Sequence, residues 1–283
     1  MARLDAALVQ RGLATSRTRA QRLIAQSRVL VNDAVVTRAA TPVQDGDAVT
    51  VAGEEDYVSR SAHKLLGALD TFGALPDAPR VAGVRALDAG ASTGGFTQVL
   101  LERGAEQVVA VDVGTDQLHP ALRADPRVAV MEHTNVRTLT PGDIGGQVEL
   151  LVADLSFISL RLVLDAFAAC LRPGGHAVVL VKPQFEVGRE RLGAGGIVTD
   201  AGARTDAVIG VLRAAHTGGW RVRAVAPSIL PGTHGNREYL AWWQAPAAQD
   251  ATLEPEDRVE EMLRDLARRG TNGELAVAEW ETW

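Results

Sequence analysis

The stretch Ala86-Leu87-Asp88-Ala89-Gly90-Ala91-Ser92-Thr93-Gly94-Gly95-Phe96-Thr97 decides the fold of this chain. An apolar run ends in an acidic residue and a series of small residues and glycines, and the helix-forming segment 98–102 follows. This order predicts a buried parallel strand, a tight turn and the N-terminus of a helix. Such a turn can hold a nucleotide, because backbone N–H groups at a helix N-terminus attract polar and anionic groups. The alternative is a glycine turn that only joins strand to helix.

The spacing of this turn separates it from the dinucleotide-binding pattern. The three glycines of G-x-G-x-x-G are absent, and the turn runs Asp88-x-Gly90-x-Ser92-x-Gly94. This spacing resembles the first motif of S-adenosylmethionine-dependent methyltransferases, in which small residues let the backbone approach the cofactor. The cofactor contacts that the resemblance implies here are Asp88, Gly90, Ser92, Thr93, Gly94, Gly95 and Phe96.

Further apolar segments alternate with helical ones along the chain. Strands are predicted at 108–112, 128–131, 148–154 and 177–183, and this alternation favours an α/β fold with a doubly wound parallel sheet. Ligands bind at the carboxyl ends of strands in such sheets. The cofactor contacts expected at strand ends are therefore Asp112 for the ribose hydroxyls, the neighbouring Val113, Asn135 near the adenine, and Asp154. The alternative for Asp112 is a carboxylate that only caps the following turn.

Lysine is rare in this chain and is placed selectively. Of 29 basic residues, only Lys64 and Lys182 are lysine. A lysine can lose its proton when it is desolvated or lies near another cation, whereas arginine stays protonated. Lys182 lies at the end of the strand predicted at 177–183 and is the candidate general base. The alternative is the chance survival of two lysines in an arginine-rich composition.

Charge is distributed unevenly over the 283 residues. The net charge is −6, but residues 1–38 carry seven arginines against Asp5 and Asp33, a local +5 that leaves −11 for the remainder. A basic N-terminal segment on an acidic body suggests a nucleic-acid contact. The single cysteine, Cys170, excludes an intrachain disulfide and is compatible with a reducing compartment. No apolar run approaches the ~20 residues of a membrane span, so we expect a cytoplasmic protein.

The N-terminal segment predicts a small domain of its own. Helices are expected at 3–11 and 16–26, a hairpin at 28–36 and a strand at 47–51. This order resembles the S4 RNA-binding domain, in which arginines meet folded RNA. The phosphate-contacting residues that the resemblance implies are Arg3, Arg17, Arg19, Arg22 and Arg28. The alternative is a solvated arginine face on an oligomerisation module.

The expected organisation has four parts. We expect an S4-like α+β domain at 1–56, a linker at 57–63, a Rossmann-like methyltransferase domain at 64–250, and a C-terminal helix and tail at 251–283. The loop at 188–202 contains five glycines, and we expect it to be mobile and to close over substrate.

Four separated residues carry a resemblance over most of the chain. Lys64, Asp154, Lys182 and Glu238 match the K-D-K-E tetrad of RrmJ/FtsJ-like ribose 2′-O-methyltransferases. Together with the S4-like domain, the chain resembles the TlyA family, known both as haemolysins and as ribosomal RNA cytidine 2′-O-methyltransferases. The resemblance implies S-adenosylmethionine as cofactor, ribosomal RNA within ribosomal subunits as partner, and no metal. One departure is Ser61-Ala62, where the family usually has two glycines.

The residue types fit methyl transfer to a hydroxyl. Lys182 would remove the hydroxyl proton, helped by the charge of Lys64; Asp154 would orient Lys182, and Glu238 would hold Lys64 or the ribose. The alternatives are two structural ion pairs at a sheet edge, a non-catalytic RNA-binding protein with a methyltransferase fold, or a haemolysin-like membrane-active protein. A membrane-lytic protein needs a spanning or strongly amphipathic segment, and none is seen.

Overall fold

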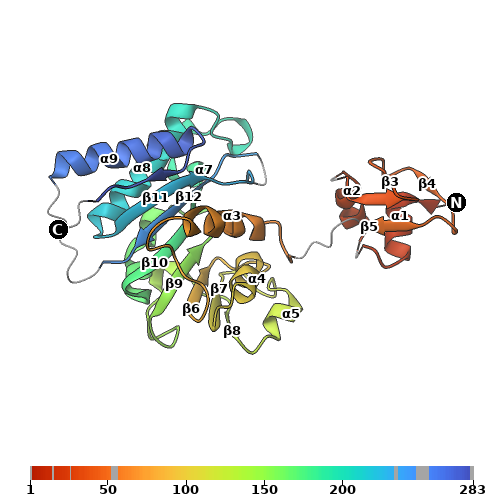
Figure 1. Cartoon of the computed structure of the whole chain (residues 1–283), viewed down its shortest axis with the longest axis horizontal. Coiled ribbons are helices and arrows are strands. Elements are labelled where there is room, and N and C mark those ends of the chain that lie inside the picture. The colour runs from red at the N-terminus through yellow and green to blue at the C-terminus, as the bar shows by residue number, and fades with distance from the viewer. Residues whose placement is uncertain are drawn as a thin grey trace. The chain divides into compact units, whose positions relative to one another are not determined.

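The computed structural model describes residues 2–14, 16–25, 27–51, 57–232, 235–246 and 255–280. The chain divides into two compact units, Met1–Asp56 and Tyr57–Trp283 (Figure 1). Each unit has hydrophobic core residues of its own. The acidic stretch 53–56, where we expected the boundary, lies outside the described residues.

The first unit is a small α+β domain. Its elements are β1 (Ala2–Arg3), α1 (Leu4–Gln10), α2 (Arg17–Ala25), β2 (Val29–Val31), β3 (Ala34–Val35), β4 (Pro42–Val43) and β5 (Val49–Val51). The apolar faces of both helices enclose one core with Val29 of the sheet. The predicted order of two helices, hairpin and strand is confirmed. The strands β1 and β4 were missed, because two residues are too few to show an alternating pattern.

An eight-stranded sheet forms the centre of the second unit (Figure 1), in the order β13-β11-β12-β10-β9-β6-β7-β8. The strands are β6 (Arg85–Ala89), β7 (Gln107–Val111), β8 (Val128–Met131), β9 (Val148–Ala153), β10 (Leu171–Val181), β11 (Arg221–Pro227), β12 (Tyr239–Gln244) and β13 (Ala276–Val277). The five strands β6 to β10 pair in parallel, and β12, β11 and β13 continue the sheet antiparallel. The predicted α/β class is confirmed.

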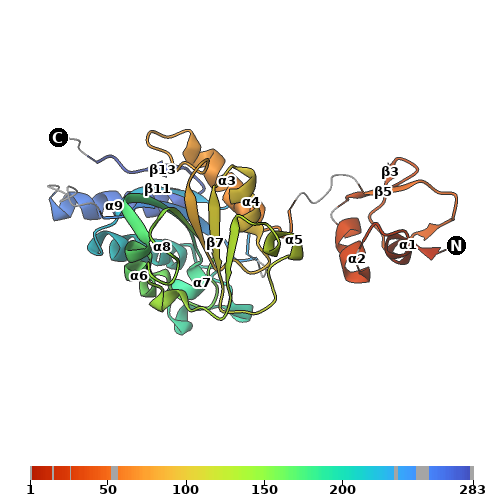
Figure 2. The same cartoon turned by 90° about the horizontal axis from the view of Figure 1, so that it is seen from below.

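Helices cover both faces of this sheet (Figure 2). They are α3 (Ala62–Gly73), α4 (Gly95–Glu102), α5 (Pro120–Arg123), α6 (Leu164–Cys170), α7 (Pro183–Glu186), α8 (Ala201–Thr217) and α9 (Glu256–Thr271). The helices α3 and α4 pack on one face, and α6, α8 and α9 pack on the other. Burial on both faces explains why the parallel strands are almost continuously apolar in sequence.

The structure changes two of the expected boundaries. Residues 57–63 are not a free linker, because the Val58 N–H donates to Gln98 Oε1 at 2.8 Å and the Arg60 guanidinium donates to the Pro231 carbonyl at 2.9 Å. Residues from 255 onward are not a separate tail either. The helix α9 buries its apolar face in the core of the sheet, and β13 pairs with β11. Both segments bury apolar side chains in the cores of this unit, which removes apolar surface from water.

Candidate active site

The turn after β6 is shaped by glycine. Gly90 has φ +85° and Gly94 has φ +96°, a left-handed backbone that favours glycine. A Cβ on Gly90 would lie 3.0 Å from the carbonyl oxygen of Asp154. Glycine therefore lets the turn lie directly against the end of β9.

Asp112 joins this turn to the end of the next strand. Its Oδ2 accepts a hydrogen bond from the Ser92 N–H at 2.8 Å, and its Oδ1 accepts one from the Gly114 N–H at 2.7 Å. The carboxylate thus caps the loop after β7, which was the alternative that the sequence left open. It also lines the larger of two neighbouring cavities, so capping and ligand binding do not exclude each other.

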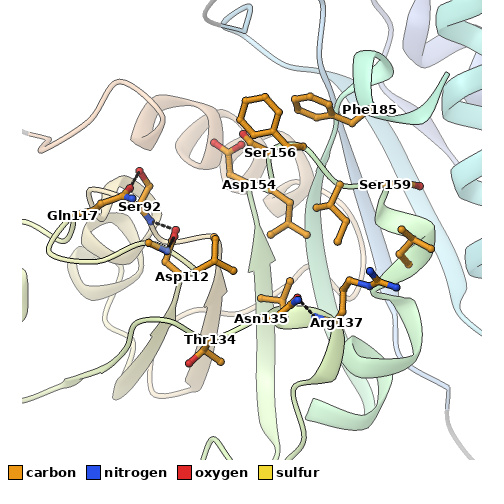
Figure 3. Close-up of a pocket in the computed structure, with 18 residues that line it drawn as sticks. Ser92, Asp112, Gln117, Thr134, Asn135, Arg137, Asp154, Ser156, Ser159 and Phe185 are labelled. Carbon is orange, nitrogen blue, oxygen red and sulfur yellow. Dashed lines mark hydrogen bonds between the residues drawn. The ribbon is translucent and has the colours of Figure 1, made fainter. Parts of the chain in front are cut away.

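The larger cavity, about 760 Å³, lies at the carboxyl ends of the parallel strands (Figure 3). Of the residues expected to bind the cofactor, it is lined by Gly90, Ser92, Asp112, Val113, Asn135 and Asp154. Asn135 Oδ1 accepts a hydrogen bond from the Arg137 N–H at 3.0 Å and so caps a short 3₁₀ turn. The wall on the β9 side continues through Ser156 and Phe157.

Three residues of the turn lie outside the walls of both cavities. Asp88 is fully buried, its Oδ2 accepts the Thr97 hydroxyl at 2.6 Å, and burial raises the pKa of its carboxyl to about 7. A Cβ on Gly94 would overlap Leu122, and one on Gly95 would overlap Ser61. These residues support the turn from beneath, and their contact with the cofactor stays a prediction. Alternation along β6 turns Asp88 into the interior.

A smaller cavity of about 200 Å³ adjoins the first. The two cavities share the lining residues Gly90, Ser92, Asp154 and Ser156. Thr93 and Phe96 line only the smaller one. All four tetrad candidates line it: Lys64 from α3, Asp154 after β9, Lys182 after β10 and Glu238 before β12.

The four tetrad side chains form two ion pairs. Lys64 Nζ lies 2.5 Å from Glu238 Oε2, and Lys182 Nζ lies 2.6 Å from Asp154 Oδ1. We expected the charge of Lys64 to act on Lys182. Because Glu238 compensates that charge, the repulsion between the two amines is weaker than the sequence alone implied.

Two aromatic residues beside the tetrad had no assigned role. The Phe157 side chain is 91% exposed, and its φ of +65° is uncommon for a bulky residue. Its ring centroid lies 5.3 Å from that of Phe185, and Lys182 Nζ lies 6.0 Å from the Phe185 centroid. Phe157 lies three residues after Asp154, and Phe185 lies three residues after Lys182.

Glu186 links the two loops that carry Asp154 and Lys182. Its buried carboxylate accepts hydrogen bonds from the Ser159 hydroxyl at 2.6 Å and the Leu160 N–H at 2.8 Å. Burial raises the pKa of this carboxyl. The loop after β9 is therefore fixed to α7, which begins directly after Lys182.

The glycine-rich loop at 188–202 is held at residues 196–198. The Asn236 carboxamide accepts from the Val198 N–H and donates to the Gly196 carbonyl, both at 3.0 Å. Asn236 is buried and lies two residues before Glu238. This anchoring opposes the expected free movement of the loop at residues 196–198.

In the first unit, two of the predicted RNA-binding arginines share a carboxylate. Arg3 Nε lies 3.1 Å and Arg17 Nη2 lies 3.2 Å from the fully buried Asp5, whose carboxyl pKa they hold well below its usual range. Arg28 is half-buried, and the side chains of Arg19 and Arg22 lie outside the described residues. The charge pattern of residues 1–38 does not reveal that Asp5 is buried.

Neither a metal cluster nor a membrane span is indicated by the described residues. In the described part of the chain, no group of three or more histidine, cysteine, aspartate or glutamate residues is placed to hold a metal ion. Within that same part, no helix is long and apolar enough to cross a membrane.

Comparison with known proteins identifies the family. A model of FtsJ-like methyltransferases matches residues 57–245, and a model of the S4 domain matches residues 2–49. The 16S/23S rRNA (cytidine-2′-O)-methyltransferase TlyA of Mycobacterium tuberculosis is 53% identical over 243 residues, which cover 85% of this chain and 89% of that protein. The chain belongs to the TlyA family of FtsJ-like methyltransferases.

Two further proteins that are similar to this chain are named hemolysins. Hemolysin A of Brachyspira hyodysenteriae is 36% identical over 240 residues, which cover 84% of this chain and 98% of that protein. A solved structure from Streptococcus thermophilus, also named a hemolysin, has a TM-score of 0.71 and 36% identity and covers 96% of both chains. The resemblance to the TlyA family inferred from sequence is confirmed.

Proposed function

We propose that this TlyA-family protein transfers a methyl group from S-adenosylmethionine to the ribose 2′-hydroxyl of a cytidine in ribosomal RNA. The observation that carries the proposal is the junction of the two cavities at Gly90, Ser92, Asp154 and Ser156. The larger has the size of a small-molecule site, and the smaller contains two lysines and two carboxylates. A cofactor in the larger cavity and a ribose in the smaller would meet beside Asp154.

The larger cavity fits S-adenosylmethionine chemically. Asp112 uses its carboxylate for two backbone N–H groups and still has lone pairs to accept ribose hydroxyls. The backbone at Gly90 can approach a ligand closely, because no side chain intervenes. When bound, the cofactor supplies a methyl group on a positively charged sulfur, and the Asp154 carboxylate on the shared wall would favour that charge.

The smaller cavity supplies the groups that act on the ribose. In its neutral form, Lys182 accepts the proton of the 2′-hydroxyl as the oxygen attacks the methyl carbon. Asp154 then stabilises the resulting ammonium at the distance of the observed ion pair. The Lys64–Glu238 pair forms the opposite contact for the ribose and helps to align the attacking oxygen.

The RNA substrate is supported by the first unit and by the aromatic wall. The S4 match at 2–49 contains seven arginines against four aspartates, a net charge of +3, which favours phosphate contacts. The exposed Phe157 ring offers a surface on which a base can stack beside the tetrad. A relative that is 53% identical is named for cytidine 2′-O-methylation of 16S and 23S rRNA. We therefore propose ribosomal subunits as partners and the cytoplasm as the location.

The test is incubation of the wild-type protein with radiolabelled S-adenosylmethionine and each purified ribosomal subunit. The modified nucleoside is then mapped by nuclease digestion and mass spectrometry. We expect label on the 2′-oxygen of a cytidine in at least one subunit. Binding to RNA without incorporation would favour the non-catalytic alternative, and label on a base would overturn the proposed chemistry.

A further inference from the structure

We propose that Ser156 is a positioning residue that directs the amine of Lys182 toward the ribose hydroxyl. The inference rests on the proposed function, in which Lys182 removes the hydroxyl proton. Lys182 Nζ donates a hydrogen bond to Ser156 Oγ at 3.1 Å. Because Ser156 follows Asp154 by two residues, one short segment after β9 supplies two partners to the same amine.

The two partners differ in what they control. Asp154 Oδ1 lies 2.6 Å from Lys182 Nζ, yet among the described residues no donor is aligned with this oxygen for a hydrogen bond. An ion pair depends mainly on distance, whereas a hydrogen bond also depends on angle. Asp154 therefore supplies charge, and Ser156 fixes the direction of one N–H bond.

The direction matters because a neutral amine has one lone pair. The nitrogen of Lys182 carries its carbon substituent, two hydrogens and that lone pair in a tetrahedral arrangement. One hydrogen is donated to Ser156, and the negative charge of Asp154 disfavours a lone pair directed toward that carboxylate. The lone pair therefore takes a tetrahedral direction that faces neither Ser156 nor Asp154. A serine hydroxyl that accepts from Lys182 thus keeps the lone pair available for the hydroxyl proton of a ribose.

The location of Ser156 agrees with this role. Ser156 lines both cavities, and it lies beside Asp154 and near Phe185 in Figure 3. The loop that carries it is tied to α7 through Glu186. Ser156 itself is exposed, so its replacement removes a hydroxyl without opening a hole in the core.

The test compares Ser156→Ala and Ser156→Thr with wild type and with Thr140→Ala. Thr140 is also exposed, donates its hydroxyl to Asp143 at 2.7 Å and lines neither cavity. We measure kcat and KM with the ribosomal subunit that accepts methyl groups, at several pH values, and the Kd of S-adenosylmethionine by calorimetry. Ser156→Ala is expected to lower kcat about tenfold or more, since misplacement of a catalytic group costs up to ~100-fold.

The remaining parameters separate positioning from other roles. We expect KM and the cofactor Kd of Ser156→Ala to stay within about twofold of wild type, and the loss in kcat to persist at high pH, where protonation no longer limits the base. Ser156→Thr, which keeps a hydroxyl, should recover most of the activity, and Thr140→Ala should match wild type.

Three results would overturn the role of Ser156 while leaving the proposed function intact. They are an unchanged kcat in Ser156→Ala, a loss that disappears at high pH, and a weakened cofactor Kd with normal kcat at saturating cofactor. If the wild-type protein itself methylates no ribose in either subunit, the proposed function fails instead.

Discussion

Lys64 Nζ and Glu238 Oε2 lie 2.5 Å apart although 174 positions separate the two residues in the chain. The side chains are only 6% and 3% exposed. Glu238 reaches this position because Gly232 leaves room for its carboxylate, which a Cβ at 232 would overlap. The pair joins α3 to the start of β12 across the smaller cavity.

Breaking this buried pair is expected to destabilise the protein. Glu238→Gln leaves the Lys64 ammonium buried without a countercharge, and the loss of one partner of such a pair costs about 3–5 kcal/mol. We expect a decrease near the lower end of that range in the free energy of unfolding, measured by urea denaturation. The control is Glu260→Gln, which disrupts half-exposed pairs with Arg213 and Arg264 and should cost about 1 kcal/mol or less. An equal loss of unfolding free energy in the two variants would contradict the view that the buried pair contributes more to stability than the half-exposed pairs.

Replacing Lys182 should stop methyl transfer and spare cofactor binding. Lys182→Ala removes the amine that takes the hydroxyl proton, and general base catalysis contributes ~10²–10⁴-fold to rate. Lys182→Arg should fail as well, because a guanidinium stays protonated. Methyl incorporation into RNA and the calorimetric Kd of S-adenosylmethionine are measured for both variants. Retained transfer in either one would remove Lys182 as the base.

Arginines of the first unit are expected to bind RNA phosphates. Replacing Arg17 and Arg28 by alanine should weaken binding to ribosomal RNA and reduce the slope of log K against log salt by about 0.7–0.9 for each phosphate that is no longer neutralised. The control replaces Arg264 and Arg268 by alanine, which removes the same two charges from exposed positions on α9. Unchanged affinity and slope in the double variant would remove these arginines from RNA recognition.

The buried carboxyl of Asp88 should make stability depend on pH. Burial raises its folded-state pKa to about 7, far above the usual ~3.9 of the unfolded chain. Between about pH 4 and 7 the folded state therefore holds a proton that the unfolded state releases, so this group lowers stability as pH rises through that window. Asp88→Asn keeps an acceptor for Thr97 but does not titrate. We measure the free energy of unfolding by urea at several pH values. The stability of Asp88→Asn relative to wild type should increase from pH 4 to 7 and then level off. A constant difference would argue against the raised pKa.

Periodicity and motif spacing were sufficient for much of the fold. The strand predicted at 128–131 is β8 with the same bounds, and the strand predicted at 148–154 is β9 extended by one residue. Gly90, Asp112 and Asp154 were predicted to lie together because each follows a parallel strand, and all three line one cavity. These predictions succeeded because a parallel sheet buried on both faces leaves a strong apolar signal and places its strand ends on one edge.

The spacing of motif residues along the sequence did not predict in which direction each side chain points. Asp88 belongs to the motif that decided the fold, yet it points into the interior and contacts Thr97. Residues 57–63 were predicted to be a linker, but Tyr57 and Val58 pack on the core of the second unit, and Val58 and Arg60 form hydrogen bonds within it. Which face a residue presents depends on neighbours that are distant in sequence.

The sequence by itself determined the α/β class, the polar residues at the ends of the parallel strands and the family, and it singled out Lys64, Asp154, Lys182 and Glu238 as tetrad candidates. Only the tertiary structure decided the partners: Lys64 with Glu238, Lys182 with Asp154 and Ser156, and Glu186 with the loop that carries Ser159. Local patterns fix which element forms, because hydrophobic periodicity acts over a few residues. Ion pairs and hydrogen bonds act over a few ångströms in space, so they are set only once packing has brought separate strand ends together.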